Sequence, residues 1–188
     1  MVNTGPHNNT IAGIAVALKQ AASPAFKLYA KQVREDAHAI ATRLKELGYK
    51  LVTEGTVNHL VLWDLRPIGL TGSKMEKMCD AVNMTLNKNA VHGDVSAFTP
   101  GGVRIGTSAL ASRSLTAQDS IQVADFLHTA AQLALEIQKT SGKLMKDFCK
   151  QLETNEQVKE LKMKVTQFAQ SFPMPGFDPT SVPAEFRH

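Results

Sequence analysis

Apolar side chains recur at helical spacing in three long stretches of the chain. One begins after Ser23-Pro24, a pair typical of a helix cap and first turn, and ends at Gly48. A second starts near Leu115, where Thr116 and Asp119 have the spacing of a capping box. The third covers residues 156–172. Each pattern places apolar residues on one side of a helix and predicts a helix with one buried face.

Residues 11–22 show a different pattern. Asn9 or Thr10 is expected to cap a helix that is apolar almost all round, with polar residues only at Lys19-Gln20. A helix of this kind has to be covered on several sides. The rest of the chain offers few partners for it, so packing against another domain or a second subunit is favoured over burial in the chain's own core.

Short apolar runs between the helical stretches predict strands. Residues 49–52 and 59–65 are expected to form two of them, the second central in a sheet, and residues 84–87 an edge strand. A helix is expected between them, capped by Thr71 or Ser73. Gly72-Ser73-Lys74 lacks the glycine spacing of a phosphate-binding loop.

The order of these elements defines the fold class. Two helices, two strands, a helix, two strands and then several helices predict an α+β fold, with a small, mostly antiparallel sheet covered by helices on one face.

Composition excludes several function classes. The chain has 188 residues, with 43% hydrophobic and 20% charged, and its net charge of +4 is scattered, which argues against a nucleic-acid-binding module. Its two cysteines are far apart and its six histidines lack ligand spacing, so a metal site is not expected. No apolar run has the length of a membrane span, and no secretory signal is recognisable. A cytoplasmic location is expected, with a mitochondrial one as the alternative.

The strongest candidate for chemistry is a glycine turn followed by an arginine. Pro100-Gly101-Gly102 predicts a sharp turn, and Val103 and Ile105 predict a buried strand face with Arg104 on the other side. A guanidinium projecting from a strand suits a carboxylate or a phosphate, since it donates two parallel hydrogen bonds. The alternative is an arginine paired with an Asp or Glu of the same chain.

Several motifs of the chain resemble the serine hydroxymethyltransferase family, in the same order and over essentially the whole chain. The motifs are Gly5-Pro6-His7-Asn8, Val16-Ala17-Leu18-Lys19-Gln20-Ala21, Asn58-His59-Leu60, Asp64-Leu65-Arg66, Asn87-Lys88-Asn89, Gly102-Val103-Arg104-Ile105-Gly106-Thr107 and Phe172-Pro173-Met174-Pro175-Gly176. The last of these is similar to the end of the eukaryotic members. The resemblance therefore identifies the chain as a C-terminal portion of such an enzyme.

The resemblance implies a fold type I enzyme that uses pyridoxal phosphate to interconvert serine and glycine, with transfer of a one-carbon unit to tetrahydrofolate. It implies that residues 1–48 are the end of the large domain and a connector, and residues 49–188 the C-terminal small domain. A homo-oligomer is implied, without nucleic acid or membrane.

The resemblance also implies roles for single residues. Arg104 matches the arginine that binds the amino acid's carboxylate, and Gly5 matches a glycine whose backbone reaches the cofactor phosphate of a neighbouring subunit. The positions that match folate contacts are Asn89, Ser96, Ala97 and Phe98.

The chain departs from the family in what it lacks. The cofactor-linking lysine, its Thr-His-Lys setting and the acid/base carboxylate have no counterpart, so no catalytic residue is expected in this chain. It is expected to be inactive alone and to bind no cofactor by itself. The alternative function is a non-catalytic interaction module that pairs with full-length subunits.

Overall fold

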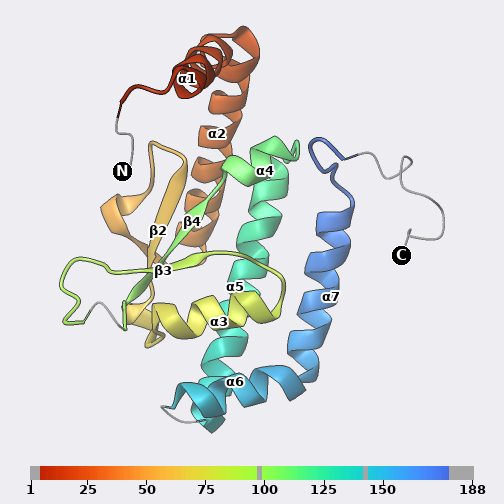
Figure 1. Cartoon of the computed structure of the whole chain (residues 1–188). Coiled ribbons are helices and arrows are strands. Elements are labelled where there is room, and N and C mark those ends of the chain that lie inside the picture. Colours follow the sequence, from red (N-terminus) through yellow and green to blue (C-terminus); the bar gives the residue numbers. More distant parts are fainter. Residues whose placement is uncertain (1–4, 97–98, 142–143, 178–188) are drawn as a thin grey trace.

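The computed structural model describes residues 5–96, 99–141 and 144–177, which form an α+β structure (Figure 1). In chain order the helices and strands are α1 (Asn8–Ala21), α2 (Pro24–Glu46), β1 (Lys50–Leu51), β2 (Leu60–Asp64), α3 (Gly72–Ala81), β3 (Asn87–Asn89), β4 (Gly102–Gly106), α4 (Ser108–Ser112), α5 (Ala117–Ser141), α6 (Met145–Thr154) and α7 (Glu156–Gln170). Short 3-10 turns follow β1 and β2. The fold class and the order of elements expected from the sequence are confirmed.

The strands form one antiparallel sheet in the order β1-β2-β4-β3. In the β2–β4 pair, Val61 lies opposite Ile105 and Trp63 opposite Val103, and all four side chains are buried. Leu62 lies opposite Arg104 on the other face. Because side chains alternate along a strand, this register gives the sheet one packed face and one solvent-facing face. We call these the closed face and the open face.

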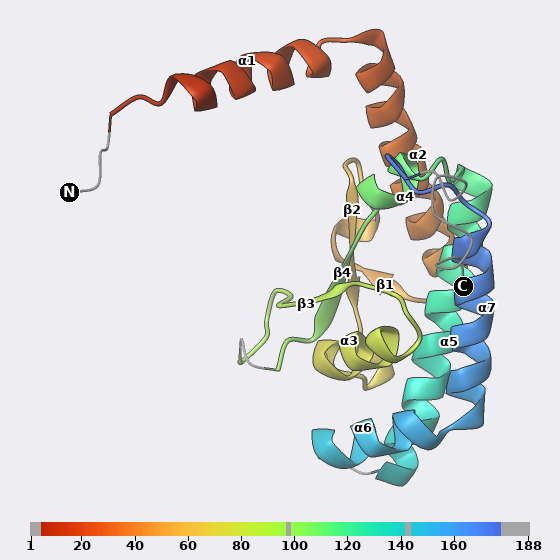
Figure 2. The same ribbon diagram turned by 45° about the vertical axis from the view of Figure 1, so that its right-hand side comes forward.

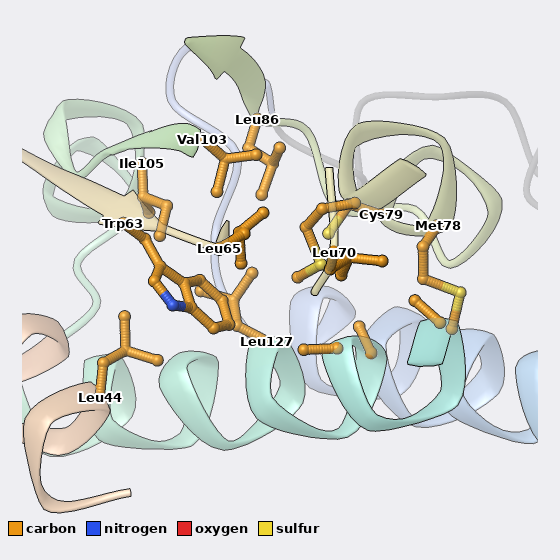
Figure 3. Close-up of a cluster of buried hydrophobic side chains, with 14 of the residues drawn as sticks. Leu44, Trp63, Leu65, Leu70, Met78, Cys79, Leu86, Val103, Ile105 and Leu127 are labelled. Atoms are coloured by element: carbon orange, nitrogen blue, oxygen red, sulfur yellow. The ribbon is translucent and has the colours of Figure 1, made fainter. Parts of the chain in front are cut away.

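The closed face packs against α2, α3 and α5 (Figure 3). Trp63 is completely buried and lies between Leu44 of α2 and Leu127 of α5. Its ring also contacts that of Tyr49, with centroids 4.5 Å apart. In Figure 2 the described helices that pack on the sheet lie on this side, and none covers the open face.

Three predicted helix starts are confirmed by their caps. The Ser23 hydroxyl accepts a hydrogen bond from the amide of Phe26, and the Thr71 hydroxyl accepts one from Lys74. The amide of Thr116 donates to the Asp119 carboxylate and the amide of Asp119 donates to the Thr116 hydroxyl, which together form the predicted capping box. These signals are local, so the sequence reveals them directly.

Other boundaries differ from expectation. The first helix begins at Asn8 with His7 as N-cap and no side-chain cap, so the predicted caps Asn9 and Thr10 are wrong. The strand expected over residues 49–52 is only two residues long, since Thr53 turns into left-handed backbone with φ 61°. The edge strand lies at Asn87–Asn89 instead of residues 84–87.

Helix α1 stands apart from the rest of the structure. It projects from the top of α2, with its N-terminal end directed away from the sheet (Figure 2). None of its 14 residues is buried, and Ile14 and Leu18 are 55% and 66% exposed. The alternative prediction, that this helix is buried in the chain's own core, is therefore wrong for the part of the chain that the structure describes.

Candidate functional site

Arg104 lies at the middle of β4 on the open face. Its cross-strand neighbours are Leu62 on β2 and Asn87 on β3. Its side chain is exposed, and it makes no hydrogen bond or ion pair with any residue the structure describes. The alternative, that Arg104 pairs with an Asp or Glu of the same chain, is thus not found among the residues that the structure describes. All five guanidinium N–H donors remain free for an external acceptor.

Asn89 lies on the same face as Arg104. It is opposite Gly102 and two residues along β3 from Asn87, so both asparagines and the arginine share one side of the sheet. The Asn89 amide donates to the carbonyl of Ala90 at 2.7 Å, which fixes the side chain's orientation. The structure therefore brings two of the sequence-predicted site residues to one surface.

The other predicted folate positions lie in the β3–β4 connection. Ser96 is half-buried there. Ala97 and Phe98 lie outside the described residues, so their predicted role stays a prediction.

Arg66, at the end of β2, forms a polar cluster under the open face that sequence reasoning did not identify. Its Nε and Nη2 donate to the two oxygens of Asp64, each at 2.9 Å. Its Nη1 donates to the carbonyl of His92 at 3.0 Å and reaches Asp94 at 3.4 Å. The side chain of Asp64 is 2% exposed, and its hydrogen bonds from Arg66 lower its pKa. Arg66 thereby joins the sheet to the base of the β3–β4 connection.

Asp94 closes that connection. Its carboxylate accepts hydrogen bonds from the amides of Gly101 at 2.8 Å and Val91 at 2.9 Å. These bonds, followed by the charge of Arg66, lower the pKa of Asp94. The two ends of the segment between Val91 and Gly101 are thus held by one side chain.

The glycine pair before Arg104 is explained by contacts of its backbone. A Cβ at Gly101 would lie 2.6 Å from the Arg66 side chain and 2.7 Å from Asp94. A Cβ at Gly102 would lie 2.7 Å from the carbonyl oxygen of Trp63. The glycines therefore allow the arginine cluster and the neighbouring strand to approach, and they are not evidence of a ligand.

Thr107 fixes the other end of β4. It is completely buried, and its hydroxyl donates to the carbonyl of Val33 in α2 at 2.7 Å. Its amide donates to the carbonyl of His59 at 3.0 Å. Arg104 thus lies on a strand that is anchored at both ends.

The lysines of the sheet do not form a cofactor-linking site. Lys50 lies 3.7 Å from Asp64, and Lys88 lies 4.0 Å from Glu76 on α3. Neither is a cross-strand neighbour of Arg104. The sheet therefore presents neither of these two lysines opposite Arg104.

Lys74, in the sequence Gly72-Ser73-Lys74, is held by contacts with other side chains of the chain. Its ammonium donates to Gln138 at 3.1 Å and lies 5.2 Å from the ring centroid of Phe148. Burial lowers its pKa. This agrees with the interpretation of Gly72-Ser73-Lys74 as a helix start without a phosphate loop.

Gly5 is exposed and precedes α1, whose N-terminal end lies far from the sheet in Figure 2. It is not brought together with Arg104 or Asn89.

Across the described ranges, no three His, Cys, Asp or Glu side chains gather as a metal site would require. A search of the same ranges finds no helix of the length and apolarity that crossing a membrane demands.

Comparisons with known proteins agree on one family. The family model described as serine hydroxymethyltransferase matches residues 1–127. The chain is 57% identical to serine hydroxymethyltransferase 4 of Arabidopsis thaliana, over 92% of this chain and 37% of that protein. It is 49% identical to the cytosolic serine hydroxymethyltransferase of Neurospora crassa, over 91% of this chain and 37% of that protein. The chain spans little more than a third of the length of these curated relatives.

Proposed function

The chain belongs to the serine hydroxymethyltransferase family, and from this premise we propose that it supplies the amino acid carboxylate site and part of the folate site of such an enzyme. The family interconverts serine and glycine with pyridoxal phosphate and tetrahydrofolate. The chain corresponds to a C-terminal portion, so the remaining parts of the active site come from other residues of the enzyme.

The unpaired state of Arg104 is the observation that carries this proposal. Arg66 has the same chemistry, but its donors are already taken by Asp64, Asp94 and a backbone carbonyl. Arg104 has all its donors free on the open face. A bidentate pair between Arg104 and the α-carboxylate of serine or glycine would fix the orientation of the amino acid, because two parallel hydrogen bonds leave little rotational freedom.

Asn89 is proposed as a folate contact on the same face. Its Nδ2 donates to Ala90, which leaves the amide oxygen and a second N–H for a ligand. Folate carries both donors and acceptors on its pterin ring, which suits an amide. Ser96, Ala97 and Phe98 remain proposed contacts from the connection held by Asp94.

The isolated chain is proposed to be inactive. When bound, pyridoxal phosphate supplies the electron sink for the reaction, and neither Lys50 nor Lys88 of the sheet is a cross-strand neighbour of Arg104. Arg104 then binds and orients the substrate only when the rest of the enzyme is present.

A chimera tests the proposal. The matching third of Arabidopsis serine hydroxymethyltransferase 4 is replaced by this chain, and glycine formation from serine is followed with tetrahydrofolate. We expect the chimera to be active and Arg104→Ala to lower kcat/KM for serine by about 100-fold or more, since a charge-assisted bidentate pair is lost. Arg34→Ala, which removes another exposed arginine, is the matched control and should stay within about two-fold.

Two results would contradict the proposal. Equal activity of the Arg104→Ala and Arg34→Ala chimeras would remove Arg104 from the site. Serine cleavage by the isolated 188-residue chain with added pyridoxal phosphate would show that the chain has a complete site of its own.

A second candidate function is a non-catalytic module that pairs with full-length subunits. The observation that favours it is α1, whose apolar side chains, such as Ile11, Ile14 and Val16, are all more than half exposed. The test is co-purification with serine hydroxymethyltransferase 4 at micromolar concentration. Pairing that is lost in Ile14→Glu supports the module, whereas no pairing of the unaltered chain counts against it.

A further inference from the structure

A cavity of about 200 Å³ lies on the opposite side of the sheet from the open face. Its walls come from the β3–β4 edge of the sheet, from α4 and from α5 and α7, which run alongside each other in Figure 1. Leu86, just before β3, and Ile105 of β4 line it on one side, and Val123 and Phe126 of α5 line it on another. Among the described residues proposed to bind substrate or folate, Arg104, Asn89 and Ser96 do not contribute to it.

Aromatic rings form one wall of this cavity. The ring centroids of Phe126 and Phe168 are 5.4 Å apart, and those of Phe168 and Phe172 are 5.0 Å apart, both in edge-to-face arrangement. All three rings are only half-buried. The wall can therefore add a further ring in the same edge-to-face or offset geometry, which is favourable beyond simple apolar burial.

Arg113 is the charged residue among the described residues of the lining, and its Nε and Nη2 are already used in hydrogen bonds. It donates through Nε to the carbonyl of Pro173 at 3.1 Å and through Nη2 to the carbonyls of Ala169 and Phe172. These carbonyls lie at and just beyond the carboxyl end of α7, where a cation is favourable. At the rim, the Asn83 amide donates to the Thr166 hydroxyl at 3.1 Å. Most of the other lining side chains are apolar, so an anion would lose its water without gaining an unoccupied Nε or Nη2 donor, and the lining favours a neutral ligand.

We propose that this cavity is a binding site for a small, neutral aromatic molecule of one or two fused rings. An apolar protein cavity of about 150 Å³ is enough to hold benzene, so the present volume leaves room for a bicyclic ligand such as indole. The ligand would contact Leu86 and Ile105, which adjoin Asn87 and Arg104 in sequence, from the closed side. The site does not depend on the proposed role of Arg104 in substrate binding.

Titration of the chain with indole tests the proposal. Amide chemical shifts are expected to change with saturation at Leu86, Ile105 and Phe168, and indole at ten times its Kd should raise Tm by roughly 3–6 °C. Ala169→Leu places a larger side chain in the cavity and should weaken indole binding at least ten-fold. Ala39→Leu, a half-buried alanine on α2 away from the cavity, is the matched control and should bind indole like the unaltered chain.

A charged analogue distinguishes a site for neutral rings from a site for anions and needs no altered protein. Indole-3-carboxylate should bind at least ten-fold more weakly than indole, because its carboxylate would lose water in a mostly apolar lining where the Nε and Nη2 of Arg113 already donate to carbonyls of the chain. Tighter binding of the carboxylate would overturn the proposal in favour of an anion site. Shift changes scattered over the exposed α1, or the absence of saturable changes, would equally overturn it.

Discussion

The two faces of the sheet use the same strands for different purposes. On the closed face, Trp63, Val103 and Ile105 are buried and belong to the same hydrophobic core as the apolar residues of the helices. On the open face, Arg104 has no side-chain partner in the described structure, whereas Arg66 donates hydrogen bonds to Asp64, His92 and Asp94. The comparison shows how adjacent residues of one strand can be assigned to different roles. A side chain that is buried against the helices serves stability, whereas one whose hydrogen-bond donors have no partner in the described structure is a candidate for ligand binding.

The largest expected difference between the faces comes from truncating Trp63. Trp63→Ala should lower the free energy of unfolding by about 3–5 kcal/mol, since a large buried side chain leaves a cavity. Leu62→Ala, one residue earlier on the open face, should cost about 1 kcal/mol or less. Urea unfolding of both variants measures the difference. Similar losses for the two would contradict the assignment of faces.

The two glycines at the ends of β4 give a second test. A Cβ at Gly102 would lie 2.7 Å from the carbonyl oxygen of Trp63, so Gly102→Ala should destabilise by about 2 kcal/mol through backbone displacement. Gly106 has no atom within 4 Å of a built Cβ, so Gly106→Ala should stay within about 0.5 kcal/mol. Thermal unfolding is the measurement, and equal effects would show that the strands do not approach as described.

Acid should affect the Arg66 cluster. The pKa of Asp64 is lowered in the folded state by Arg66, so its stabilisation is complete above its unfolded pKa of about 3.9 and is lost as pH falls through the lower folded value. Tm should therefore fall more steeply below about pH 4 in the unaltered chain than in Asp64→Asn. Burial raises the pKa of Asp36, so this residue changes the pH dependence of stability in the opposite direction. Its contribution is the same in the unaltered chain and in Asp64→Asn, so it does not affect the comparison. Matching Tm curves would exclude the cluster as a source of stability.

Arg104 should have the smallest effect on stability. Because it has no partner in the described structure, Arg104→Gln should change the free energy of unfolding by less than about 0.5 kcal/mol, as for other exposed residues. Urea unfolding at pH 7 measures it. A loss of 2 kcal/mol would mean that the guanidinium is engaged within the chain and is unavailable to substrate.

The parts of the fold that were predictable from sequence rest on local signals. Ser23, Thr71 and Thr116 cap helices through bonds to residues only three positions away. Alternation of apolar and polar residues likewise placed Arg104 opposite a buried face, because the period of a strand is visible in a few residues.

The parts that were not predictable depend on distant contacts. The Arg66 cluster requires Asp94, 28 residues away, which only the folded sheet brings within reach. The edge strand begins at Asn87 because that residue pairs with Arg104, which is 17 residues away in the sequence. The motif Asp64-Leu65-Arg66 was a usable signal, since the two charges lie on one side of a strand end.

Helix α1 has a consequence for the dynamics of the chain. An isolated helix of 14 residues is only marginally stable in water, and α1 has no buried residue to support it. Its amide hydrogens should therefore exchange with solvent much faster than those of α5, whose buried side chains hold it in the core. A protease that cleaves after Lys19 would find this segment transiently unfolded while the sheet and its helices stay folded. Whatever covers α1 would slow both processes, so exchange and cleavage rates report directly on whether that surface is occupied.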